Sequence, residues 1–267
     1  MNFWQVDAFA DKIFEGNPAA VFIFDREPSV DLMMKIAREM NLSETAFVIK
    51  GEDLQIRWFT PNAEVNLCGH ATLSAAHILW QEGLVENSEI IFKSRSGSLR
   101  VTRSGIGYTL DFPLQPPTEQ RDSDLVMQIL GLEPEFIGSN GEDCMAVVLN
   151  DEIVRTFSPN YQKICQLPER GFLLTAQDQS GEFDYIYRAF FPKLDVPEDP
   201  VTGSANTCLA PYWSMRLNKQ KLRARQISAR GGTLDLEILK DRVLITGSAV
   251  TVFQGVMDMP AKGIHSV

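Results

Sequence analysis

The hydrophobic pattern of the chain is organised around a run of small and apolar residues between 66 and 80. The run opens with a Cys-Gly-His turn at 68–70 and contains no proline. Its apolar positions recur at helical spacing on two faces, Ala71, Ala75, Ile78 and Leu79 on one and Leu73, Ala76 and Trp80 on the other. A helix that is apolar nearly all round is buried, so its N-terminal N–H groups should lie inside the protein, where they can bind a carboxylate or phosphate.

The same design recurs in the second half of the chain. In both copies an acidic residue, Glu64 or Glu198, stands five positions before a glycine, Gly69 or Gly203, and a small apolar run follows. The flanking segments repeat in the same order, Arg57–Pro61 and Ser96–Leu99 in the first copy and Arg188–Pro192 and Gly231–Leu234 in the second. Three motifs in one order at nearly constant offset indicate two copies of one fold unit.

The remaining pattern predicts mostly strands, with few further helices. In the first half, Ser29 can cap a helix that ends at Asn41, and the expected strands are Asn2–Phe9, Ala19–Phe24, Leu42–Ile49, Leu54–Phe59, Glu89–Lys93, Ser98–Thr102 and Gly107–Phe112. In the second half, the expected helices are 122–130, a short one near 161–165 and a buried one from Gly203, and the strands are 144–149, 153–157, 171–176, 184–191, 223–228, 233–239, 242–246 and 248–255.

These elements predict an α+β fold of two similar halves, each a curved, mostly antiparallel and barrel-like sheet around one central helix. The Pro-rich segment Pro113–Pro117 is the candidate linker. We therefore expect an N-terminal half at 1–115 and a C-terminal half at 116–267, with the extreme C-terminus free to pack on the first half. At 267 residues, each half is long enough to bury its own core.

Net charge, hydrophobic runs and cysteine spacing indicate which binding partners and which cellular location to expect. With 25 basic and 35 acidic residues the net charge is −10, which disfavours nucleic acid and anionic membrane surfaces. No apolar run has the length of a transmembrane helix, and the N-terminal segment lacks the pattern of a signal peptide. The four cysteines form no Cys-x-x-Cys pair, which favours reduced thiols over disulfides or a zinc site. We expect a cytoplasmic protein.

Glu44 is the first candidate for chemistry, because it stands between a predicted helix end and an apolar strand. Desolvation there would raise its pKa toward the range of a general acid or base. The alternative is a capping or salt-bridged glutamate at an element boundary. The corresponding position of the second half, near Arg170, offers no carboxylate, and asymmetry within a duplicated fold is where function is added.

Polar residues at the two helix starts are the other candidates. His70 follows Gly69, where the helix dipole favours a neutral imidazole, and Ser204 is its counterpart after Gly203. Ser204 can equally be a helix cap, and Asp199 a turn residue. The three histidines form no metal constellation, and the chain has no dinucleotide fingerprint, P-loop or nucleophile elbow, so neither a metal nor an organic cofactor is expected.

Six motifs spanning nearly the whole chain resemble the phenazine-biosynthesis isomerase-like (PhzF-like) family of the diaminopimelate epimerase fold. They are Asp7-Ala-Phe9, Gly16-Asn-Pro18, Ser43-Glu-Thr-Ala-Phe47, Cys68-Gly-His-Ala-Thr72, Asp199-Pro-Val-Thr-Gly-Ser-Ala205 and the glycines Gly247 and Gly255. The resemblance implies two similar halves with the site in the cleft between them. It also allows a homodimer.

By this resemblance the protein is a cofactor-independent isomerase that acts on a small, cyclic, carboxylate-bearing metabolite. Glu44 would be the acid/base that takes a proton from one carbon and returns it to another. The substrate would be oriented by a set of side chains and backbone N–H groups, namely His70, Asp199, Ser204, Gly69 and Gly203.

Two alternatives remain open. Racemases and epimerases of the wider fold use two cysteines, one in each central turn. Here Cys68 precedes Gly69, but the second position is Thr202, which favours a one-base isomerase over a two-base epimerase. An amino-acid epimerase or dehydratase that pairs Cys68 with another group is the second enzyme hypothesis, and a non-catalytic metabolite-binding protein is the third.

Overall fold

The computed structural model describes residues 1–105, 107–120 and 124–258, and it divides the chain into two compact units. The first unit combines residues 1–111 with the stretch that begins at Thr246, and the second is the continuous segment Phe112–Ile245. The expected boundary after residue 115 lies a few residues beyond the first crossing point. Among the described residues, no helix combines the length and apolar character needed to cross a bilayer.

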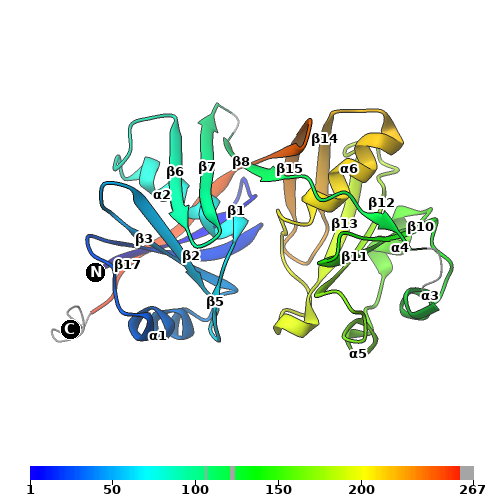
Figure 1. The fold of residues 1–267 in the computed structure, drawn as a ribbon, viewed down its shortest axis with the longest axis horizontal. Coiled ribbons are helices and arrows are strands. Elements are labelled where there is room, and N and C mark those ends of the chain that lie inside the picture. Colours follow the sequence, from blue (N-terminus) through cyan, green and yellow to red (C-terminus); the bar gives the residue numbers. More distant parts are fainter. Residues whose placement is uncertain (106, 121–123, 259–267) are drawn as a thin grey trace. The chain divides into compact units, whose positions relative to one another are not determined.

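Within its described residues, the first unit is a mixed sheet with two helices (Figure 1). Its strands are β1 (Asn2–Ala8), β2 (Asn17–Phe24), β3 (Glu44–Ile49), β4 (Leu54–Phe59), β5 (Glu64–Val65), β6 (Glu89–Ser94), β7 (Gly97–Ser104), β8 (Gly107–Pro113) and β17 (Ala249–Val256). Hydrogen bonding links them in the order β17-β1-β2-β3-β4-β6-β7-β8, with β2–β3 and β4–β6 parallel and the other neighbours antiparallel. In Figure 1 the red strand β17 runs beside the blue strand β1, so a strand from the far end of the chain completes this sheet.

The two helices of the first unit differ in burial. Helix α2 (Gly69–Gln81) has ten buried residues among its 13 and contacts β1, β2, β3 and β17, as the two-faced apolar pattern predicts. Helix α1 (Val30–Met40) is amphipathic and buries only Met33, Ile36 and Ala37. It begins where Ser29 Oγ accepts the Leu32 N–H and ends where Asn41 turns left-handed, as expected from the sequence.

The second unit repeats this plan. Its strands are β9 (Thr118–Glu119), β10 (Phe136–Ser139), β11 (Asp143–Val147), β12 (Gly171–Gln177), β13 (Tyr185–Phe190), β14 (Lys221–Gln226), β15 (Gly232–Leu239) and β16 (Arg242–Gly247), whose last residues pass into the first unit. Its helices are α3 (Asp124–Leu130), α4 (Asp151–Thr156), α5 (Tyr161–Ile164), the 3₁₀ turn η1 (Pro192–Leu194) and α6 (Asn206–Leu217). The buried helix here is α6, which packs on β14 and β15.

The repeat is visible in strand pairing. The series β2-β3-β4-β6-β7 alternates parallel and antiparallel pairs, and β11-β12-β13-β14-β15 alternates in the same sequence. Thr45 pairs with Phe59 and Phe172 pairs with Phe190, which makes Gly171 the counterpart of Glu44. The α+β fold of two similar halves is therefore confirmed.

The repeated acidic residue forms the same contact in each copy. Arg57 Nε and Nη2 contact the two Glu64 oxygens at 2.8 and 2.7 Å. Arg188 Nε and Nη2 contact the Glu198 oxygens at 2.7 and 2.8 Å. A bidentate pair fixes both side chains in orientation as well as position, so each copy uses it to hold the segment that leads to its buried helix.

Three expected elements differ from the structure. Residues 153–157 were expected to be a strand, but α4 covers 151–156, because Asn150 Oδ1 accepts the Glu152 N–H and caps a helical turn. A short apolar run has no period that separates helix from strand. The second buried helix begins at Asn206 rather than Gly203, because 3₁₀-type bonds tighten the turn at 203–205. The expected helix 122–130 begins at Asp124, and 122 and 123 lie outside the described residues.

Candidate active site

Glu44 is the first residue of β3 and stands at the edge of the core. Its side chain is 19% exposed. Burial raises the pKa of its carboxyl, and a hydrogen bond with Ser43 opposes the rise. One carboxyl oxygen, Oε2, lies 3.3 Å from His70 Nε2. A carboxyl with this degree of burial and an imidazole neighbour can exchange a proton more readily near neutral pH than an exposed one.

His70 is the second residue of α2, and its ring lies between two possible proton carriers. The residue is 7% exposed. Nε2 faces Glu44 and also lies 3.5 Å from Ser43 Oγ, while Nδ1 lies 3.5 Å from Cys68 Sγ. Ser43 Oγ in turn donates to Asn17 Oδ1 at 3.3 Å. The imidazole thus lies between Ser43 and Glu44 at the start of β3 on one side and Cys68 at the start of α2 on the other.

The start of α2 adds a positive dipole end to this group. Cys68 is the N-cap residue, with extended backbone and no hydrogen bond from its side chain to the helix. Its carbonyl accepts the first helical bond, from Thr72 N at 3.2 Å. The N–H groups ahead of Thr72, including that of Gly69, therefore point away from the helix body, where they favour negative charge.

In the second unit, Asp199, Gly203 and Ser204 lie on one hydrogen-bonded turn. The Thr202 hydroxyl donates to Asp199 Oδ2, and Thr202 N donates to Gln226 Oε1 at 2.6 Å. The Gly203 and Ser204 carbonyls accept from the first N–H groups of α6. The structure therefore gathers the expected site residues into two groups, Glu44, Gly69 and His70 in the first unit and Asp199, Gly203 and Ser204 in the second.

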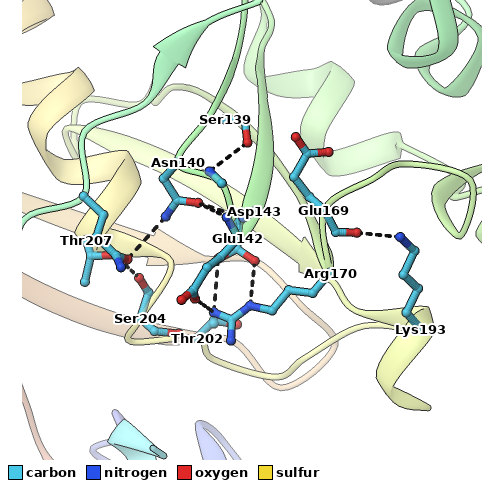
Figure 2. Close-up of polar contacts among 12 residues, drawn as sticks. Ser139, Asn140, Glu142, Asp143, Glu169, Arg170, Lys193, Thr202, Ser204 and Thr207 are labelled. Carbon is cyan, nitrogen blue, oxygen red and sulfur yellow. Dashed lines mark hydrogen bonds and ion pairs between the residues drawn. The ribbon is translucent and has the colours of Figure 1, made fainter. Parts of the chain in front are cut away.

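The second unit has no room for a counterpart of Glu44. A Cβ on Gly171 would lie 2.3 Å from the Phe191 ring and 2.8 Å from Asp143 Oδ1. The position before it holds Arg170, which contacts Asp143 Oδ1 at 3.1 Å and Glu142 Oε2 at 2.9 Å (Figure 2). Where the first unit has an acid/base candidate, the second has a glycine and an ion-pair cluster.

Reasoning from sequence missed some of the neighbours of Glu44. Ser43 contacts His70, and Asn17 accepts a hydrogen bond from Ser43. Both residues lie inside motifs named in the sequence analysis, so those motifs were the signal that could have found them. It also found no metal constellation, because it considered the spacing of histidines and of cysteines separately and did not combine them with Glu44. In the structure, potential ligand atoms of Glu44, Cys68 and His70 lie within 4.8 Å of one another.

Comparison with known proteins agrees with this architecture. A family model described as phenazine biosynthesis-like protein matches residues 6–255. A relative named an uncharacterized isomerase, from Halalkalibacterium halodurans, is 43% identical over 94% of this chain and 96% of its own. The crystal structure of a PhzF family protein from Enterococcus faecalis is 39% identical, covers 97% of this chain and 99% of that one, and has a TM-score of 0.93.

A more distant likeness concerns the fold alone. The crystal structure of a probable proline racemase from Agrobacterium radiobacter is 12% identical, with a TM-score of 0.62 over 98% of this chain and 94% of that one. The likeness shows that the two proteins share a fold. The family model over residues 6–255, the relative from Halalkalibacterium halodurans and the structure from Enterococcus faecalis show that the chain belongs to the phenazine biosynthesis-like (PhzC/PhzF) family.

Proposed function

We propose that this protein is an isomerase that moves a proton between two carbons of a small, cyclic, carboxylate-bearing metabolite without a bound cofactor. The observation that carries the proposal is the mostly buried carboxyl of Glu44, 3.3 Å from the buried imidazole of His70 at the start of α2. The relative from Halalkalibacterium halodurans is itself named an isomerase, which supports this reaction class.

In the proposed reaction Glu44 is the single acid/base. Its carboxylate takes a proton from one carbon, and the carboxylic acid so formed returns that proton to another. His70 hydrogen-bonds the substrate and holds Glu44 in place. The negative charge that develops on the substrate is stabilised by N–H groups at the start of α2, including that of Gly69.

The second unit supplies binding groups in this proposal. Asp199, Ser204 and the backbone of Gly203 bind the polar substituents of the substrate, a role that the family resemblance assigns to them. Their turn is suited to it, because Asp199 is anchored through Thr202 and Gln226 rather than left to rotate freely.

The test is proton NMR in D₂O with trans-2,3-dihydro-3-hydroxyanthranilate and a panel of small cyclic carboxylates. We expect conversion with deuterium incorporation by the unmodified protein, and a loss of about 10²- to 10⁴-fold in Glu44→Gln. Glu39→Gln, at an exposed glutamate of α1, is the matched control and should keep full activity. Exchange that persists undiminished in Glu44→Gln would remove Glu44 as the base.

One contact favours a second candidate function. Cys68 Sγ lies 3.5 Å from His70 Nδ1, so the thiol can exchange protons with the imidazole. This is compatible with an amino-acid epimerase or dehydratase in which Cys68 acts opposite another group. Full activity of Cys68→Ser on the converted substrate would argue against this candidate.

A further inference from the structure

Three side chains around the start of α2 carry the donor types that proteins use for zinc. They are the carboxylate of Glu44, the thiol of Cys68 and the imidazole of His70, and their ligand atoms all lie within 4.8 Å of one another. We propose that these residues form a binding site for a borderline-soft divalent cation of the Zn²⁺ type. The site is assembled from the first residue of β3 and the first turn of α2.

The interatomic distances fit a shared ion. Zn–S and Zn–N bonds of about 2.3 and 2.0 Å at a tetrahedral angle place sulfur and nitrogen about 3.5 Å apart. One ion binds one imidazole nitrogen, and Nε2 is the one that faces Glu44. Cys68 Sγ lies 3.9 Å from Nε2 and 3.5 Å from Nδ1. Zn–N and Zn–O bonds of about 2.0 and 2.1 Å place nitrogen and oxygen about 3.3 Å apart, and the Nε2–Oε2 distance is 3.3 Å. With Nε2 as the ligand, the nitrogen–oxygen distance matches a zinc site and the sulfur–nitrogen distance is about 0.4 Å too long, so a bound ion would draw Cys68 toward the imidazole.

The donor set decides which ion is favoured. Thiolate and imidazole select zinc and similar transition metals, whereas Mg²⁺ and Ca²⁺ require oxygen ligands. Three protein ligands leave a fourth tetrahedral position for water or a ligand.

The charges around the site are also suitable. A metal binds the ionised forms of Cys68 and Glu44, and the positive end of the α2 dipole favours both anions. The same dipole end repels a cation, but the two negative charges of Cys68 and Glu44 neutralise the charge of the divalent ion. Ser43 Oγ lies 3.5 Å from His70 Nε2, but its proton is donated to Asn17 Oδ1, so it does not compete for the nitrogen lone pair that the ion would use.

A consequence follows for the proposed isomerase, and it rests on that function. An ion bound to the Glu44 carboxylate occupies one of its oxygen lone pairs and withdraws charge from the others, which makes the group a poor acceptor for the substrate proton. Metal and turnover therefore exclude each other, and Zn²⁺ should inhibit in competition with substrate. Binding of the ion does not depend on any activity.

The test is isothermal titration of the full-length, reduced and metal-free protein with ZnCl₂. Cys165→Ser is the matched control, because Cys165 is an exposed thiol outside the cluster. We expect one equivalent to bind to the unmodified protein and to Cys165→Ser, and the affinity to fall about 100-fold or more in Cys68→Ser and in Glu44→Gln. MgCl₂ should give no saturable binding.

Co²⁺ supplies an independent spectroscopic readout. A thiolate-to-cobalt charge-transfer band should be present in Cys165→Ser and absent in Cys68→Ser, with folding of each variant checked by circular dichroism. Equal Zn²⁺ affinity in Cys68→Ser and Cys165→Ser, or no binding to the unmodified protein, would overturn the site. Binding without turnover of any substrate would leave the metal site standing and count against the proposed isomerase alone.

Discussion

At the scale of single residues, the four cysteines occupy environments that differ sharply. Cys144 and Cys208 are buried in the second unit, and burial, followed by nearby acidic groups, raises the pKa of each thiol to about 12. A neutral thiol is a poor nucleophile and a poor metal ligand. Cys165 is exposed, and Cys68 is buried beside an imidazole. The four cysteines should therefore differ in chemical reactivity.

This difference predicts the outcome of thiol titration. In the native protein near neutral pH, a thiol-specific disulfide reagent should modify Cys165 at once, while Cys144 and Cys208 should react only after denaturation. Cys165→Ser should remove the fast phase. Rapid native-state labelling of Cys144 or Cys208, located by peptide mass spectrometry, would contradict the burial described here.

The pair Gly171 and Phe191 makes a second prediction at this scale. Because a methyl group on Gly171 meets the Phe191 ring and Asp143, Gly171→Ala should destabilise the protein by about 1–3 kcal/mol in denaturant unfolding. Gly105→Ala is the control, since no atom of the described residues other than its chain neighbours lies within 4 Å of its Cβ position, and it should change the free energy of unfolding little. An unchanged stability of Gly171→Ala would mean that the ring moves aside without cost.

At the scale of elements, His77 links α2 to two strands of the first unit. Its Nδ1 contacts the Tyr108 hydroxyl of β8 at 2.8 Å, and its Nε2 contacts Thr251 Oγ1 of β17 at 3.0 Å. Burial lowers the pKa of this imidazole, against a smaller opposing effect of Gln81. The neutral ring is therefore the form that joins the helix to the strand β17.

The lowered pKa of His77 makes the stability of the folded protein depend on pH. The unfolded chain binds a proton at His77 at higher pH than the folded protein, so stability is lost as pH falls through the ordinary value of 6.5 toward the folded pKa. We expect His77→Gln to be less stable than the unmodified protein at pH 8 and to lose less stability between pH 7 and about 5. Parallel pH profiles of unfolding for the two proteins would contradict this role.

One element illustrates how an unfavourable residue is accommodated. Helix α6 contains Pro211, which has no N–H to donate to the carbonyl of Thr207 one turn earlier. That carbonyl instead accepts from Gln115 N at 2.9 Å. The proline thus frees an acceptor that ties the first segment of the second unit to its buried helix.

At the scale of the whole molecule, the sequence was sufficient for the fold because the fold is a repeat. The glycine turns, the arginine and glutamate positions and the run of small apolar residues recur in order, so the two copies support the same prediction. Strands of two to four residues such as β5, β9 and β10 were not found, because so short a run carries no period.

The candidate site was only partly predictable, for a different reason. Glu44 stands out locally as a carboxylate at the start of an apolar strand. Its approach to Cys68 and His70 depends on how α2 packs under β3, which no local pattern encodes. The absence of a counterpart at Gly171 was visible in the sequence, but its cause, the Phe191 ring, was not.

The two crossings of the chain between units have a consequence for biosynthesis. The second unit is one continuous segment, whereas the first needs β17, which is translated after the whole of the second. On the ribosome the second unit can therefore complete its sheet first. Until β17 is made, one edge of β1 stays unpaired. An unpaired strand edge can pair with other chains, so the nascent first unit is exposed to association with neighbouring chains until β17 is made.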